Sequence, residues 1–336
     1  MIVSESNALQ ESDTLKYLVV TLLLAIPVAW GAGSGETGFE QLFRLLTDGE
    51  LSGGEKTILL DLRLPRILGA ILTGGMLSSA GCAAQNLFRN DLASPHVLGC
   101  VNAAALGAVA ALLLGAGPLV MSGCALGMTM ITLFILLIPG WRSGWEGAPI
   151  ILAGVAVNAC CAALSSGALY LADERLNTLV FWLLGGFWRM GWQEIFLLLP
   201  VAVAGWSILY KLAPEMDMLL LGDRGALMAG VDLKKVKITV LLVIAFLTAA
   251  AVSCCGVIGF VGLAVPHIVR LTGSGSFKRV LPRTIVSGAL LLLLADLAGR
   301  LAAPEREIPV GIITALAGGP FFFWLLLKKG ASHDRV

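Results

Sequence analysis

The fold class is decided by residues 63–99, RLPRILGAILTGGMLSSAGCAAQNLFRNDLASPHVLG. This stretch begins with two arginines around a proline and continues through an uncharged segment, Ile67 to Ala84, that is rich in Gly, Ala and Ser. It ends in a polar elbow, Gln85 to Ser94, before the chain becomes apolar again at Pro95. In lipid, small residues let helix backbones approach closely. The uncharged segment is therefore predicted to span a membrane, packed among other helices.

The composition of the whole chain points the same way. Of its 336 residues, 57% are hydrophobic and 13% are charged, and the mean hydropathy is +0.89. A soluble domain has about 25% charged residues. The chain is therefore predicted to be an all-α polytopic membrane protein, with one transmembrane domain over residues 1–336. The formal charge of +1, without a basic cluster that contains aromatic residues, gives no indication of nucleic-acid binding.

About ten apolar runs have the roughly 17–25 residues needed to cross a bilayer. They lie near residues 15–33, 64–84, 95–114, 118–139, 149–171, 193–212, 236–255, 257–272, 284–302 and 309–327. The first run follows acidic residues and has no small-residue cleavage site after it, so it is predicted to be a retained span. The eighth is short and glycine-rich, and such helices are tolerated at membrane depth only where they are buried in protein or line a cavity.

The distribution of basic residues predicts the orientation. An even number of spans places both termini on one side. That side receives 15 of the 23 lysines and arginines and the other side receives 8. Because cytoplasmic connections carry the excess of Lys and Arg, both termini are predicted to be cytoplasmic. The longest cytoplasmic connection is then Ala213–Lys237, and the long outer connection is Ser34–Leu62.

Two features that could indicate catalysis are better explained otherwise. All seven cysteines lie in apolar segments, where they are expected to be small packing residues without a metal or redox role. Residues 51–57, LSGGEKT, resemble an ATPase signature, but Glu55 interrupts the Gly-Lys-Ser/Thr pattern that a phosphate loop needs. The chain is thus not expected to be an enzyme, and it is predicted to have no catalytic residues and no bound metal or cofactor.

Several blocks of sequence occur in the same order as in a known family. They are Arg63-Leu64-Pro65-Arg66, Asn90-Asp91-Leu92-Ala93-Ser94-Pro95, Gly259-Phe260-Val261-Gly262-Leu263 with Pro266-His267, Leu294-Ala295-Asp296, Glu307-Ile308-Pro309-Val310-Gly311, Gly318-Gly319-Pro320 and Trp324-Leu325-Leu326-Leu327-Lys328. With these blocks the chain resembles the FecCD family, the permease subunits of ATP-binding-cassette (ABC) importers for iron–siderophores, haem and cobalamin.

The resemblance implies a cobalamin-permease-like fold of ten spans in the bacterial inner membrane. It also implies a homodimer, with the pathway along its two-fold axis. Two cytoplasmic ABC ATPase subunits would use ATP and Mg, and a periplasmic or extracytoplasmic binding protein would deliver the cargo.

Three arginines match positions at the outer mouth of the family's permeases. The resemblance implies that Arg63 and Arg66 meet glutamates of the binding protein, and Arg300 matches a third such position. The alternative is that these arginines are interfacial anchors whose charged ends extend to lipid phosphate. Asp296 lies one helical turn before Arg300, so the two are predicted to form a structural pair. Proton coupling is not indicated, because no series of further acidic residues crosses that span.

The resemblance also implies a cytoplasmic gate. Asn90 and Leu92 match the elbow that closes this gate. Asp91 replaces the proline that is usual there, and its carboxylate is expected to cap the following helix. A second gate region aligns with Gly147 and Ala148, where the family's cobalamin permease has hydroxyl residues, so a gate based on hydroxyl groups is not expected.

Residues 213–237 match the family's coupling segment, two short helices that sit in a cleft of the ATPase subunit. The matched residues are Leu219, Leu221, Gly222, Asp223, Arg224, Ala226 and Leu227. An ordinary solvated loop with a cluster of positive charge is the alternative. Breaks at Gly222 and Gly230, together with the apolar positions, favour a rigid lever.

Iron–siderophore is the commonest cargo in this family and is the first expectation, with haem and cobalamin left open. A secondary transporter driven by ions would need inverted repeats and carboxylates at mid-membrane. Asp296 is the one intramembrane carboxylate in the pattern, and it lies near a span end. A membrane-embedded enzyme would need a catalytic constellation, and the three histidines are far apart in the sequence.

Overall fold

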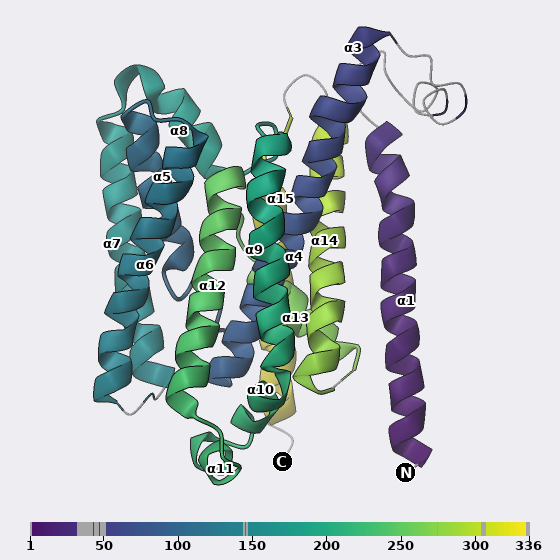
Figure 1. Cartoon of the computed structure of the whole chain (residues 1–336), viewed down its shortest axis with the longest axis vertical. Coiled ribbons are helices and arrows are strands. Elements are labelled where there is room, and N and C mark those ends of the chain that lie inside the picture. Colours follow the sequence, from purple (N-terminus) through teal and green to yellow (C-terminus); the bar gives the residue numbers. More distant parts are fainter. Residues whose placement is uncertain are drawn as a thin grey trace.

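The computed structural model describes residues 2–31, 43, 47, 52–143, 145, 147–273, 275–303 and 307–333. Over these residues the chain is helical and has no strand. The long helices run side by side in one bundle, and the connections gather at its two ends (Figure 1). The all-α prediction is confirmed.

Among the described residues, ten apolar helices correspond to the ten predicted spans. Six are long and apolar enough to cross a membrane, and four shorter apolar helices of 10–17 residues join them. In chain order, the helices at the predicted spans are α1 (Ile2–Gly31), α4 (Leu64–Phe88), α5 (Cys100–Leu113), α6 (Pro118–Arg142), α7 (Gly147–Tyr170), α9 (Trp192–Lys211), α12 (Leu233–Cys255), α13 (Val261–Leu271), α14 (Phe277–Ala302) and α15 (Val310–His333). As predicted, the eighth is short, with 11 residues in α13.

The small-residue helix α4 lies at the centre of the bundle. In its most apolar window 89% of the residues are buried, and it packs against α14, α12, α13 and α9. A methyl group at Gly81 would collide with the backbone carbonyl of Gly262 on α13, and one at Gly74 would collide with Gly288 on α14. The predicted close packing of this helix is therefore confirmed, and it depends on residues that have no side chain.

The helix that contains α4 begins earlier than the sequence predicted. The Ser52 hydroxyl accepts from the Glu55 N–H, and the Glu55 carboxylate accepts from the Ser52 N–H, which makes a capping box. The helix continues through α3 (Gly53–Lys56) and the π-helical turn η1 (Thr57–Arg63) into α4. The expected outer connection, Ser34–Leu62, is thus helical from residue 53, and part of the ATPase-like stretch is a helix start.

The helices at the edges of the bundle differ in how much of their surface is buried by other helices of the chain. α1 packs along α14, while α7 lies at the opposite edge (Figure 1). Only 17% of the most apolar window of α7 is buried, and the corresponding value for α9 is 28%. Most of the surface of α7 is therefore available to lipid or to another chain.

Two short helices, α10 (Ala213–Leu219) and α11 (Asp223–Met228), form one end of the bundle. The start of α1 and the end of α15 lie at this same end (Figure 1). Gly222 and Gly230 have φ of +91° and +85°, a backbone conformation that favours glycine. The two predicted breaks are therefore present, and the segment consists of two short helices as the resemblance implied.

Candidate functional site

Three arginines and two carboxylates meet at the end of the bundle opposite α10 and α11. This arginine cluster consists of Arg63, Arg66, Asp296, Arg300 and Glu307. Arg66 donates from Nε and Nη2 to Asp296 at 2.8–3.1 Å, and its Nη1 lies 2.8 Å from Glu307 Oε2. The Nε of Arg300 lies 3.1 Å from Asp296 Oδ2. The predicted Asp296–Arg300 pair is confirmed, and Arg66 shares the same buried carboxylate.

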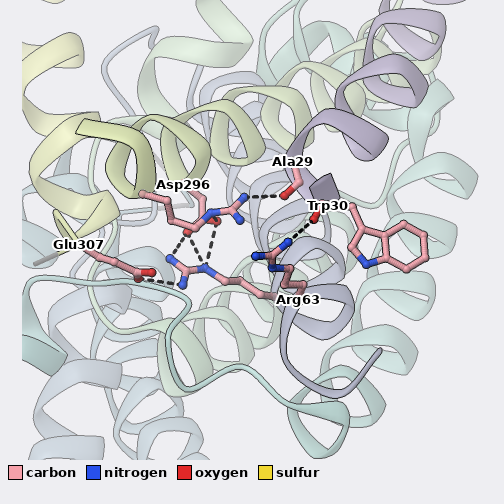
Figure 2. Close-up of polar contacts among 7 residues, drawn as sticks. Ala29, Trp30, Arg63, Asp296 and Glu307 are labelled. Carbon is pink, nitrogen blue, oxygen red and sulfur yellow. Dashed lines mark hydrogen bonds and ion pairs between the residues drawn. The ribbon is translucent and has the colours of Figure 1, made fainter. Parts of the chain in front are cut away.

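Two of these arginines also attach α1 to the bundle. Arg63 Nη1 donates to the Trp30 carbonyl and Arg300 Nη2 donates to the Ala29 carbonyl, both at 3.0 Å. Figure 2 shows the Asp296 carboxylate between guanidinium groups, with Glu307 on one side and the two carbonyls on the other. The last carbonyls of a helix have no partner within that helix, so cations are favoured there.

The cluster lines an open cavity of about 410 Å³. Its wall consists of Ile58, Leu62, Arg63, Arg66, Phe187, Trp188, Met190, Arg300 and Glu307. With three guanidinium groups and two carboxylates the cluster carries one net positive charge. The cavity therefore has a charge that favours an acidic group, even though the arginines have partners within the chain.

The predicted gate elbow is a tight turn at the other end of α4. The Asn90 side-chain oxygen accepts from the Leu92 N–H at 2.9 Å, and the Asn90 carbonyl accepts from the Ala93 N–H. This is the turn that an Asn side chain stabilises by bonding to the backbone two residues later. Leu92 is exposed on the turn.

The expectation that Asp91 caps the next helix is wrong. α5 begins at Cys100 with Gly99 as its N-cap, and turns over residues 95–99 separate it from the elbow. The Asp91 carboxylate instead lies 3.6 Å from Arg270 and 3.8 Å from His267, both on α13. It therefore joins the elbow to α13.

The structure brings the two predicted gate regions together. Gly147 begins α7, and a methyl group on it would lie 3.1 Å from the ring of Phe88, the last residue of α4. Ala148 follows on the exposed side. The elbow and the start of α7 therefore lie side by side at the end of the bundle that carries α10 and α11.

The predicted coupling residues have three different environments. Leu219 and Ala226 are buried and anchor α10 and α11 to the bundle. Leu221, Arg224 and Leu227 are exposed, and Leu220 and Met228 extend this exposed surface. Gly222 forms the turn between the helices. Asp223 points inward to Lys237 on α12, at 2.7 Å, and to Arg89, at 3.5 Å.

Two residues of these sites, Glu307 and Lys237, have no role predicted from the sequence. Nothing in the sequence near Glu307 indicates that it pairs with Arg66, because residues far apart in the chain meet there. Lys237 could have been found, since it lies on the apolar face of α12 that Leu233, Val240 and Leu241 define. A charged residue on a helical apolar stripe indicates a buried partner.

Among the described residues, no three His, Cys, Asp or Glu side chains come together as a metal site. The seven cysteines are free thiols. The described chemistry at both ends of the bundle is ionic and hydrogen-bonding, which suits binding and movement of protein elements.

Comparison with known proteins identifies the family. The model of the FecCD transport family matches residues 18–328. The chain belongs to the FecCD transport family. FecCD proteins with curated functions are similar over almost the whole length. They include an Fe(3+) dicitrate transport system permease of Escherichia coli, 34% identical over 90% of this chain and 92% of that protein.

Two other relatives have different named cargoes. A vitamin B12 import system permease of Citrobacter koseri is 35% identical over 94% of each chain. A hemin transport system permease of Yersinia pestis is 35% identical over 93% of this chain and 96% of its own. A solved metal-chelate type ABC transporter in an inward-facing conformation has a TM-score of 0.85 and 28% identity, covering 94% of this chain and 99% of the other. The chain is thus an ABC transporter permease, a membrane component of such a transporter.

Proposed function

We propose that this chain is the membrane permease of an ATP-driven importer that moves a metal chelate into the bacterial cytoplasm. The main support for this function is the family match over residues 18–328, with relatives named for ferric citrate, hemin and vitamin B12. These three cargoes share one property, since each is a metal ion held by an organic ligand. Iron–siderophore is the first candidate, and haem and cobalamin are the next two.

We infer the protein partners of the chain from the residues at the two ends of the bundle. The exposed leucines Leu221, in the turn between α10 and α11, and Leu227, on α11, would seat in an ABC ATPase subunit that binds ATP and Mg. Two copies of the permease would thus engage two ATPase subunits. The arginine cluster, with its positive cavity, would receive acidic residues of an extracytoplasmic binding protein. A second copy of this chain would complete the pathway. With the arginine cluster outside, both termini are cytoplasmic, and reporter fusions at either terminus would test this orientation.

An ion-driven secondary transporter is the alternative of another class, and the arginine cluster argues against it. Such a transporter needs a carboxylate that can take up and release an ion. The Asp296 carboxylate is already neutralised by Arg66 and Arg300 and has no exposed surface. Its contacts suit a fixed structural charge.

Uptake into proteoliposomes tests the proposal. The chain would be reconstituted with its ATPase and binding protein and offered ⁵⁵Fe-siderophore, hemin and cobalamin separately. We expect inward transport of one cargo that requires hydrolysable ATP and the binding protein, with a non-hydrolysable ATP analogue as the control. Uptake that follows an imposed proton or sodium gradient without ATP would instead support the secondary transporter.

A further inference from the structure

A buried ammonium group connects α11 to the body of the bundle. Lys237 lies in the second turn of α12, and its side chain is only 6% exposed. Its Nζ lies 2.7 Å from Asp223 Oδ2 on α11 and donates to the Trp145 carbonyl at 2.8 Å. A buried charge is tolerated only where it is paired and hydrogen-bonded. Both of these partners come from outside α12.

The same carboxylate reaches the end of α4. Asp223 Oδ1 lies 3.5 Å from the guanidinium of Arg89, the left-handed residue that caps the C-terminus of α4 and directly precedes Asn90. Gly222 leaves room for that guanidinium, since a methyl group there would lie 3.1 Å from Arg89 Nη1. One carboxylate therefore contacts a cation on α12 with one oxygen and a cation at the gate elbow with the other.

Trp145 extends these contacts to the second gate region. It lies in the connection between α6 and α7, two residues before Gly147, and Gly147 faces the ring of Phe88 at the elbow. Arg89, which contacts Asp223, directly precedes Asn90 of the elbow. Trp145, which accepts from Lys237, lies two residues before the start of α7. These contacts therefore connect α11 with both gate regions.

Stability alone does not account for a charged pair at this place. Replacing a buried ion pair by apolar residues is often neutral or stabilising, whereas a paired charge fixes the relative positions of the elements that carry it. Transmission of a movement needs such a fixed contact between rigid elements. Here the contact joins the exposed helix α11 to the two places where the pathway would close.

We propose that Lys237 and Asp223 form the joint through which a movement of α11 is transmitted to both gate regions. The proposal rests on the proposed function, because it needs an ATPase that acts on α11. Lys237 is a positioning residue that acts through Asp223 and Trp145. Its loss is expected to separate ATP hydrolysis from transport while the complex still assembles.

The experiment compares three variants of the reconstituted complex. Lys237→Met removes the ammonium and keeps most of the length of the side chain. Asp223→Asn/Lys237→Met removes both charges, so that neither is left buried and unpaired. Lys278→Met is the matched control, since it removes an exposed cytoplasmic-end ammonium that lies over the Tyr210 ring. For each variant, cargo moved per ATP hydrolysed, copurification of the ATPase and the melting temperature are measured.

We expect cargo moved per ATP to fall at least about tenfold in both Lys237 variants, within the range of about 5- to 150-fold typical of coupling between sites. ATPase copurification is retained, and Lys278→Met matches the original protein. If the double variant assembles and moves cargo at the original ratio, the proposal is wrong, even where Lys237→Met alone fails to fold.

Hydrogen exchange gives a readout that needs no cargo. Adding ATP to the complex is expected to change exchange in residues 86–94 of the original protein, and this change is lost in the double variant while α11 remains protected by the ATPase. If ATP changes exchange in residues 86–94 of the double variant as it does in the original protein, the proposed joint is wrong. Failure of the original complex to move any cargo with ATP would count against the proposed function instead, and the exchange result would still decide on the joint.

Discussion

Asp296 carries most of the ionic contacts of the arginine cluster, and its replacement is the first prediction. Removing one partner of a buried ion pair leaves uncompensated charge, at a cost of about 3–5 kcal/mol. Asp296→Asn leaves Arg66 and Arg300 without their shared carboxylate, which has 0% side-chain exposure. We expect its free energy of unfolding in detergent to fall by roughly that amount, as measured by denaturation with SDS.

Glu307→Gln provides the matched comparison for this prediction. The Glu307 side chain is 33% exposed, and exposed ion pairs are worth about 0–1 kcal/mol. The loss of stability should therefore be small. Equal and small losses in the two variants would show that Asp296 does not hold the cluster together.

Docking at the arginine cluster gives the second prediction, and the structure decides which arginine to change. A glutamate at position 66 would face Asp296 and Glu307, so a docking defect could not be separated from instability. Arg63→Gln removes one positive charge from the cavity wall and leaves both carboxylates paired with Arg66. We expect the association rate of the binding protein at low salt to fall by at least about threefold, because clefts of one charge steer partners.

Surface plasmon resonance at two salt concentrations measures this rate. The effect of Arg63→Gln should become smaller at high salt, since screening weakens the attraction. Arg189→Gln, which removes an exposed arginine outside the cluster, is the control. An association rate equal to that of the control would count against docking at the cluster.

At the scale of the elements, the close approach of α4 and α13 gives the third prediction. Gly81 faces the backbone of Gly262, which cannot move as a side chain can. Gly81→Ala should therefore force the helices apart and cost about 1–3 kcal/mol, as overpacked cores do. Gly123→Ala on α6 is the control, because the added methyl group there would meet no atom within 4 Å beyond its own stretch of helix. Thermal unfolding in detergent compares the two, and equal melting temperatures would contradict the prediction.

The elements differ in how far the sequence predicts them. The spans follow from apolar runs of sufficient length, because a helix that crosses lipid must satisfy its own backbone. The start of the α3–α4 helix was missed although the Ser52-to-Glu55 spacing indicates a capping box. The i,i+4 pair of Asp296 and Arg300 was predicted since it is local. Arg66 and Asp296 are 230 residues apart, and only the packing of α4 against α14 brings them together.

At the scale of the whole molecule, we predict that a second copy of the chain packs on α7. Its exposed surface carries, beside Leu152 and Leu164, a row of small residues that recur every three or four positions, namely Ala156, Cys160, Ala163 and Gly167. Such a row lets another helix approach closely in a membrane. The exposed surface of α9 carries Phe196, Leu199 and Val203, bulky side chains that suit lipid. We therefore expect two copies of the chain in one complex.

Native mass spectrometry in detergent measures the copy number directly, and the fourth prediction is a permease mass of about twice 35.1 kDa. Ala163→Phe places a large ring on the small-residue face of α7 and should shift the complex towards single chains. Ala204→Phe makes the same change on the exposed face of α9 and should leave two copies. If both variants remain paired, the second copy packs on another face. If the original protein is a single chain, the pathway lies within one bundle.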